Sequence, residues 1–209
     1  MQITGWKSAG MALRAIAGVA VFLSAVAAPS VSQPTSATVS AVTLSIDPAE
    51  SKVHYTVDSS LHTVHGTFNI KRGSVTFDPA GGKASGEIVV YVTSGDSGNS
   101  SRDERMHKEI LEAKKYPEAT FRPTQVEGAV TLAGGFDVKV YGIINLHGQE
   151  HEMVSAVHAE MAADHWKGTA KFDVPYIQWG IKDPSNWLLK VKPVVNVELE
   201  MVGTAKVAN

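Results

Sequence analysis

The stretch "SKVHYTVDS", residues 51–59, alternates apolar and polar side chains and decides the fold class. Successive side chains of an extended chain point to opposite faces. Val53, Tyr55 and Val57 would therefore share one face, and the residues between them would share the other. This pattern predicts a strand with one face against a core and one face in water.

Further apolar runs of strand length follow along the chain, separated by Gly, Pro, Asp and Asn. Roughly eight or nine such runs at close spacing indicate an antiparallel all-β domain. The later runs are "GSVTFDPAGG", "SGEIVVYVTSG", "ATFRPTQVEGAV", "FDVKVYGIINLHG", "HEMVSAVHAEM", "WKGTAKFDVPY" and "PVVNVELEMVGTAKV".

One segment, "SSRDERMHKEILEAKKYP" (residues 100–117), has the pattern of a helix instead. Ser101 and Glu104 have the spacing of a capping box. Met106 and Ile110 begin an apolar stripe at helical spacing, and the final proline prevents continuation. We expect one short helix that packs across an opening or an end of the β structure.

Residues 1–27 read as a signal peptide. Lys7 and Arg14 supply positive charge, and no acidic residue precedes Asp47. The apolar run "AIAGVAVFLSAVAA" is too short to span a bilayer comfortably, and an Ala-Val-Ala sequence ending at Ala27 suits cleavage. An uncleaved membrane anchor is the alternative. With the signal removed, we expect no stable membrane span and a periplasmic or secreted protein.

The rest of the chain divides into an uncharged lead-in, residues 28–43, which we expect to be flexible, and one domain, residues 44–207. The 209 residues contain 19 Lys and Arg against 21 Asp and Glu. Nucleic acid is therefore not expected as a partner, because a phosphate-binding surface needs an excess of cations. The chain has no cysteine, which excludes disulfides, thiolate metal ligands and cysteine nucleophiles.

Four histidines form two closely spaced pairs that suggest metal ligands, His62 with His65 and His147 with His151. In a strand, residues three apart point to opposite faces, and residues four apart lie about 13 Å from each other. Neither pair matches the helical His-Glu-x-x-His motif of zinc proteases. We expect no metal site, and the sequence leaves any other role of these histidines open.

Motifs of catalysis are missing from the sequence. It contains no Gly-x-Ser-x-Gly elbow, no phosphate-binding glycine loop and no dinucleotide-binding fingerprint. We therefore expect a protein that is not an enzyme and that carries no cofactor.

Several separated stretches, in this order, resemble the YceI-like family of bacterial exported proteins, which bind lipids such as polyisoprenoids. The stretches are "SKVHYTVDSSLHTVHGTF", "GSVTFDP", "RDERMHKEILEAKKYPEATF", "GIINLHG" and "FDVPYIQWGIKDP". The third is the most specific, with its Arg-Asp start, short helix and Lys-Tyr-Pro. The resemblance covers about Leu44 to Val207. After "LHG" many members continue Val-Thr-x-Pro, whereas this chain has Gln149 to Glu152.

The resemblance implies a lipocalin-like antiparallel β-barrel of about eight strands, capped by the helix, with an isoprenoid-like lipid or a quinone in its lumen. Arg102, Asp103 and Arg105 become candidates for a polar head group, the alternative being a solvated, capped helix start. The candidate lining residues, which could equally form a packed core, are Phe68, Phe77, Tyr91, Met106, Ile110, Leu111, Phe121, Phe172, Tyr176, Trp179 and Ile181.

Three functions follow from these observations. The first is an exported, non-catalytic carrier of an apolar isoprenoid-like lipid. The second is a lipocalin-like enzyme that acts on such a ligand through a histidine in the lumen, with His62, His65 and His158 as candidates. The third is a stress-related surface protein with a filled barrel that contacts a partner. The sequence leaves a homodimer open.

Overall fold

The computed structural model describes residues 41–80 and 82–208, and these residues form nine strands and one short helical segment. The predicted signal peptide and residues 28–40 of the predicted lead-in lie outside the described residues. The strands are β1 (Ala41–Ile46), β2 (Lys52–Asp58), β3 (Thr63–Phe77), β4 (Ala84–Asp96), β5 (Glu118–Glu127), β6 (Gly134–Leu146), β7 (Gln149–Ala162), β8 (His165–Val174) and β9 (Val195–Ala208).

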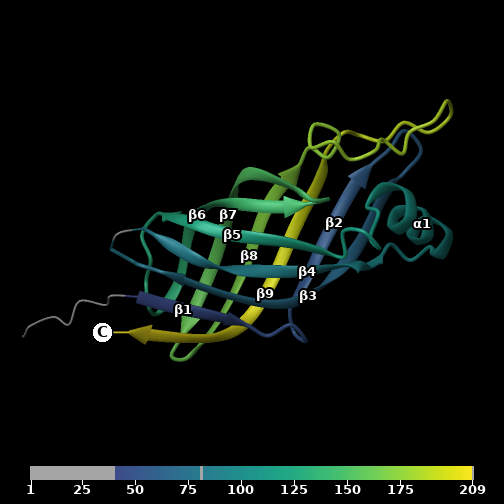
Figure 1. The fold of residues 1–209 in the computed structure, drawn as a ribbon. Helices are drawn as coiled ribbons and strands as arrows, with labels where there is room; N and C mark the ends of the chain where they lie inside the picture. The colour runs from purple at the N-terminus through teal and green to yellow at the C-terminus, as the bar shows by residue number, and fades with distance from the viewer. Residues whose placement is uncertain (1–40, 81, 209) are drawn as a thin grey trace, which may run out of the picture. The chain divides into compact units, whose positions relative to one another are not determined.

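The strands form one antiparallel sheet that closes on itself. From β4 to β9, strands that follow one another in the sequence are paired. β2 pairs with both β9 and β3, and β3 pairs with β4, which completes the ring. β1 also pairs with both β3 and β9, but further along them than β2 does. β1 and β2 therefore share one position in the wall, and the nine strands make an eight-stranded barrel. This confirms the predicted fold class (Figure 1).

Alternation along the strands separates the inside of the barrel from its surface. In β2, Val53 and Tyr55 are buried, while His54 and Thr56, which alternate with them, are partly exposed. β7 follows the same pattern over its whole length, with Met153, Ser155 and Ala159 among its buried residues. The strand pattern read from "SKVHYTVDS" is thus confirmed.

The end of the barrel that carries β1 is filled by side chains. Val42, Phe77, Phe136 and Met161 belong to one buried cluster there. Trp166 belongs to the same cluster, and its indole nitrogen donates to the backbone oxygen of Ser45 over 3.2 Å.

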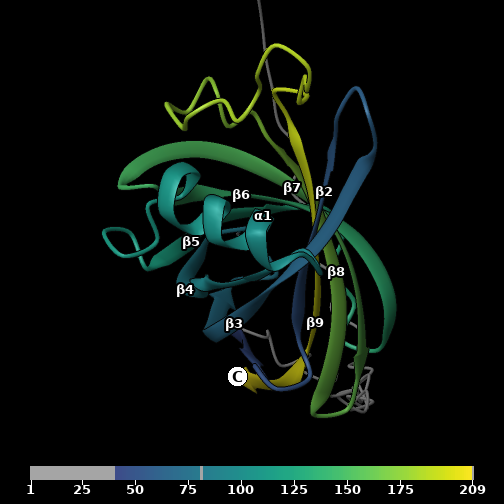
Figure 2. The same cartoon turned by 90° about the vertical axis from the view of Figure 1, so that its right-hand side faces the viewer.

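The helical segment lies at the end away from β1 and crosses it (Figure 2). It consists of α1 (Ser100–Arg105), continued by a wider π-type turn, η1 (Met106–Ile110). This confirms one short capping helix, although the helix ends earlier than residues 100–117 suggested. It ends because Glu112 takes a left-handed conformation, with φ of 44°, which turns the chain back and buries Ala113. Among the described residues, no helix has the length and apolar character needed to span a membrane.

The start of α1 also differs in detail from the expectation. Asn99, in an extended conformation, caps the helix by accepting from the backbone nitrogen of Arg102 over 3.0 Å. Glu104 forms an ion pair with Lys108 on the surface rather than completing a capping box with Ser101. Any Ser, Thr, Asn or Asp near a helix start can serve as its cap, so the pattern alone did not distinguish position 99 from position 101.

Candidate functional site

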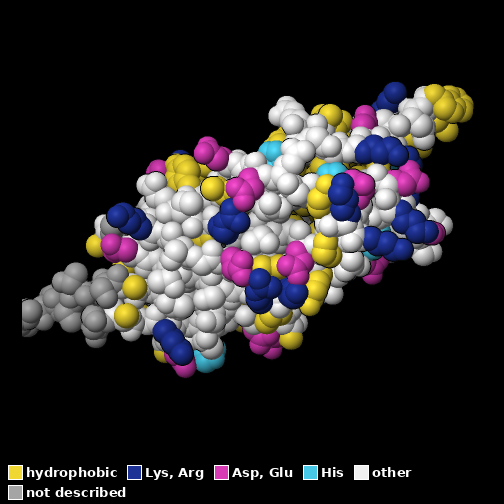
Figure 3. Space-filling view, in the orientation of Figure 1, with side chains coloured by type: hydrophobic (Ala, Val, Ile, Leu, Met, Phe, Trp, Pro, Cys, Tyr) yellow, Lys and Arg dark blue, Asp and Glu magenta, His cyan; other side chains and the backbone are white. Residues whose placement is uncertain are grey.

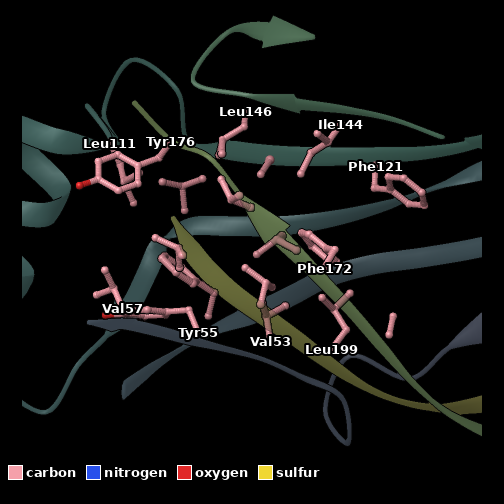
Figure 4. Close-up of a pocket in the computed structure, with 18 of the residues that line it drawn as sticks. Val53, Tyr55, Val57, Leu111, Phe121, Ile144, Leu146, Phe172, Tyr176 and Leu199 are labelled. Atoms are coloured by element: carbon pink, nitrogen blue, oxygen red, sulfur yellow. The ribbon is translucent and has the colours of Figure 1, made fainter. Parts of the chain in front are cut away.

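A cavity of about 550 Å³ occupies the barrel between the filled end and α1. Inward-facing side chains of the strands form its wall, and Ile46 and Trp166 line it at the filled end. Figure 4 shows Val53 and Tyr55 of β2, Phe172 of β8 and side chains of other strands converging on this space. Such a volume lies in the range of ligand pockets, and the lining is overwhelmingly hydrophobic.

Three segments surround the cavity at the end that carries α1, which we call the mouth. They are the helix, the β2–β3 turn and the loop of residues 175–194 between β8 and β9. Residues from these segments that line the cavity are Ser59, His62, Arg102, Arg105, Met106, Ile110, Leu111, Tyr176, Ile181, Pro184, Leu189 and Val191.

The two arginines at the mouth are held by hydrogen bonds. Arg102 donates from Nε to Ser97 Oγ over 2.7 Å and from Nη2 to the Ser97 backbone oxygen over 2.9 Å. Arg105 donates to the backbone oxygen of Pro184 over 3.2 Å and pairs with Glu109 over 3.6 Å. The helix is thereby joined to the 175–194 loop, and positive charge is fixed beside the mouth.

Two tyrosines that line the cavity have buried side chains. Tyr176 is 5% exposed, and its hydroxyl has no hydrogen-bond partner among the described residues. Burial, and then the charge of Asp183, raises the pKa of Tyr176 to about 12. The hydroxyl of Tyr55 donates to Met106 Sδ over 3.7 Å, and burial is the main cause that raises its pKa as well. Both groups are therefore uncharged hydrogen-bond donors at neutral pH.

A family model described as the YceI-like domain matches residues 44–203. The chain belongs to the YceI-like family. The match begins within β1 and ends within β9, so it takes in most of the barrel wall and the helix.

Solved structures share the fold of this YceI-like domain. BcnA of Burkholderia cenocepacia is 20% identical, with a TM-score of 0.62 over 76% of this chain and 99% of that one. A polyisoprenoid binding domain from Saccharophagus degradans, implicated in plant cell wall breakdown, is 16% identical, with a TM-score of 0.56 over 78% and 98% of the two chains. The YCEI protein of Campylobacter jejuni is 17% identical, with a TM-score of 0.52 over 68% and 81%. No curated protein matches the sequence significantly.

Most of the lining residues that the sequence suggested do line the cavity of the YceI-like domain. They come from strands, from the helix and from the 175–194 loop, so segments far apart in the sequence converge. These residues are Phe68, Met106, Ile110, Leu111, Phe121, Phe172, Tyr176 and Ile181. Of the head-group candidates, Arg102 and Arg105 line the mouth.

Four suggested residues lie elsewhere. Phe77 belongs to the filled end. Tyr91 points outward and is 39% exposed, because Ile88, Val90 and Val92 take the inward positions of β4. On the outside, Lys71 Nζ lies 5.1 Å from the centre of the Tyr91 ring. The other two are held by neighbours outside the cavity lining: Trp179 stacks on His151 with ring centres 4.3 Å apart, and Asp103 accepts from the backbone nitrogen and hydroxyl of Ser97.

The cavity lining also contains residues that the sequence patterns did not suggest. Val53, Tyr55 and Val57 line the cavity, and their alternation was already visible in the opening stretch. Deeper residues such as Trp166 and Leu199 carry no distinguishing local pattern, because core and lumen positions use the same residue types.

The histidines do not assemble into a cluster. His62 lines the mouth, whereas His65 points away to Thr56, with 3.0 Å between His65 Nδ1 and the threonine hydroxyl. His147 pairs with Glu112 over 2.8 Å, and His158 lies on the outside with Asp137 over 2.9 Å. Within residues 41–80 and 82–208, no group of three or more His, Cys, Asp or Glu could hold a metal ion.

Proposed function

We propose that this protein is a non-catalytic carrier that holds a long apolar, isoprenoid-like lipid in its barrel. The observation that carries the proposal is the cavity of about 550 Å³ with an almost wholly apolar lining. The family membership supports it, as does the relative from Saccharophagus degradans, which is named for polyisoprenoid binding. Export to the periplasm or beyond belongs to the same proposal and rests on the signal-peptide pattern of residues 1–27.

Burial of the ligand's hydrocarbon chain is enough to bind it without specific polar contacts. Each buried methylene group contributes about 0.8 kcal/mol, so ten of them contribute about 8 kcal/mol. This matches the free energy of micromolar binding, before the costs of association are subtracted. Affinity should therefore rise steeply with the number of carbons that enter the cavity.

The polar end of the ligand fits best at the mouth. Arg102 and Arg105 carry hydrogen-bond donors there, the buried hydroxyl of Tyr176 has no partner among the described residues, and the rest of the cavity wall is mostly apolar. A quinone carbonyl oxygen or a prenyl phosphate oxygen could accept from these donors. We therefore propose that the chain of the ligand enters the barrel and that its head group stays near α1.

Native mass spectrometry of the purified protein, followed by organic extraction, tests this proposal. We expect a discrete added mass that matches a prenyl lipid or a quinone. Val157→Trp fills the cavity from β7 and should abolish the added mass, whereas Ala156→Trp, on the outer face of the same strand, should retain it. Thermal unfolding of both variants confirms that they fold. A protein that stays without added mass after incubation with isoprenoid lipids contradicts the proposal.

An enzyme that uses His62 is the second candidate, because this histidine lines the mouth while His65 and His158 point outward. Incubation with the extracted lipid separates the two functions. A carrier returns the lipid with its mass unchanged. Conversion that is lost in His62→Ala would favour the enzyme. The third candidate, a filled barrel, does not agree with the cavity.

A further inference from the structure

We propose that the mouth of the barrel docks on lipid bilayers that contain anionic phospholipid, through the tip formed by Leu61, Trp187 and Leu188. Three large apolar side chains are unusually exposed to solvent there. Trp187 is 89% exposed, Leu61 is 61% exposed and Leu188 is 60% exposed. We call these three residues the apolar tip. Figure 3 shows hydrophobic side chains gathered at the end of the 175–194 loop, with basic and acidic side chains close by.

Hydrogen bonds build the apolar tip into a defined structure. The side chain of Asn186 accepts from the backbone nitrogens of Leu188 and Leu189 over 2.9 and 2.8 Å, and its own backbone nitrogen donates to the Leu189 oxygen over 2.8 Å. This compact turn holds Trp187 and Leu188 at its outer corner. Their exposure is therefore set by the fold of the loop.

Two loops that are distant in sequence meet at the apolar tip. The backbone nitrogen of Ser60 donates to the Lys190 oxygen over 2.7 Å, the Lys190 nitrogen donates to Ser60 Oγ over 3.1 Å, and Ser59 bridges to Val191. The β2–β3 turn and the 175–194 loop are thus joined side by side. Leu61 of the first loop then adds to the apolar surface of the second.

The apolar tip is continuous with the cavity. Leu188 is exposed, while Leu189, next in the chain, lines the cavity; likewise Leu61 is exposed, while His62 lines the mouth. The same short segments therefore present apolar groups to the outside and to the lumen. A lipid that leaves a membrane through this surface would pass from one apolar environment directly into another.

Charge favours a membrane as the occupant of this surface. The chain as a whole has more acids than bases, but the 175–194 loop carries Lys182, Lys190 and Lys192 against a single acid, Asp183. Lys182 pairs with Glu109 over 3.4 Å and Lys192 pairs with Asp58 over 2.8 Å. Lys190, beside the apolar tip, has no ion pair among the described residues and is the cation that a lipid phosphate would meet. Lys and Arg next to Trp and Leu are the combination that interfacial segments use, with apolar groups below the head groups and cations beside lipid phosphates. This inference rests on the proposed function only for the identity of the cargo.

Flotation with vesicles tests the docking surface. We compare vesicles of phosphatidylcholine alone with vesicles of phosphatidylcholine and phosphatidylglycerol, and use the double variant Trp187→Ser, Leu188→Ser. We expect wild type to bind the anionic vesicles more tightly and the double variant to bind them at least about tenfold more weakly, since each side chain loses its burial. Val154→Ser, an exposed apolar position on β7, is the matched control and should bind like wild type.

Two further readouts make the test specific. When wild type binds anionic vesicles, its tryptophan fluorescence should shift to shorter wavelength. Trp187→Ser should lose this shift, which assigns the shift to position 187. Lys190→Glu should weaken binding to the anionic vesicles only. Equal binding of wild type and the double variant overturns the proposal. It is also overturned if Trp187→Ser breaks a dimer of this chain and leaves vesicle binding unchanged.

Extraction of lipid from the same samples separates this proposal from the proposed function. A double variant that loses vesicle binding and keeps its cargo supports docking as a separate property. Wild type that binds vesicles through the apolar tip but carries no lipid supports docking and contradicts the carrier. Wild type that carries lipid but binds vesicles no better than the double variant supports the carrier and contradicts docking.

Discussion

At the residue scale, the polar groups of the mouth differ in how far the protein already satisfies them. Arg102 is held by Ser97, whereas the hydroxyl of Tyr176 has no partner among the described residues. A buried donor without a partner costs about 1–3 kcal/mol. Tyr176 is therefore the mouth group that should gain most from an acceptor on the ligand.

Tyr176→Phe should weaken the binding of a prenyl quinone by roughly two- to tenfold, because one net hydrogen bond is worth about 0.5–1.5 kcal/mol. The binding of a plain hydrocarbon chain should not weaken. Titration of both ligands into wild type and variant measures the difference. Tyr91→Phe, which removes a hydroxyl from the outer face, is the control. Equal losses for the two ligands would show that the hydroxyl makes no hydrogen bond to the quinone head group.

The same residue should also shape stability at high pH. Its pKa is raised from 10.0 to about 12, so above pH 10 the unfolded chain loses the Tyr176 proton more readily than the folded protein. Tyr176 therefore makes stability fall as the pH rises from about 10 to about 12. Denaturant titrations across this range should give a shallower decline for Tyr176→Phe. Identical slopes for the two proteins would contradict this role.

At the element scale, the helix is positioned by its first turn. Asn99 caps α1, and Asp103 reaches back to Ser97 with the assistance of Arg102. Ser97 comes directly after β4, which ends at Asp96. The helix is therefore tied to the end of a barrel strand, and this connection places Met106 and Ile110 over the cavity.

Asn99→Ala should destabilise the protein by about 1 kcal/mol, since it removes the side chain that accepts from the backbone nitrogen of Arg102. Ser101→Ala is the matched control. It alters the residue that the sequence pattern suggested as the cap, and it should change the free energy of unfolding by less than about 0.5 kcal/mol. Urea titration measures both. A larger loss in Ser101→Ala than in Asn99→Ala would reverse the assignment of the cap.

At the scale of the whole molecule, the barrel closes because β1 and β2 divide one wall position between them. β1 lies very close to β9: a Cβ atom on Gly203 would stand 1.8 Å from the backbone oxygen of Ser45. The backbone there cannot move without separating β1 from the wall. Gly203 is therefore required for closure of the filled end.

Gly203→Ala should destabilise the barrel by about 3 kcal/mol, the upper part of the range for overpacking, and lower Tm by roughly 10 °C. Gly135→Ala is the control, because the nearest atom to its added Cβ, on His158, is at an ordinary contact distance of 3.4 Å. Calorimetry of the two variants checks the prediction. A Tm for Gly203→Ala equal to that of wild type would mean that β1 is not needed for closure.

The local sequence pattern showed which side chains point into the barrel only in strands that alternate apolar and polar residues. Val53, Tyr55 and Val57 alternate with polar residues, so their inward face could be read directly. The run "IVVYV" in β4 has no polar residue to mark its outer face, so the pattern did not show which side chains point inward, and Tyr91 was assigned to the wrong face. Phe77 has the inward direction of a lining residue, but how deep it lies depends on the pairing of β3 with β1.

The sequence by itself determined the all-β class and the place of the helix, which follow from period, turn residues and residue type, all local properties of the chain. The barrel of about eight strands and its candidate lining residues were implied by the resemblance to the YceI-like family, and most of those residues line the cavity. Only the tertiary structure decided which end of the barrel is filled, which hydroxyl lacks a partner and which loops meet at the mouth. These depend on contacts such as Ser60 with Lys190 and Trp166 with Ser45, between residues more than a hundred positions apart. No local pattern encodes such pairs, because they form only when the ring of strands closes.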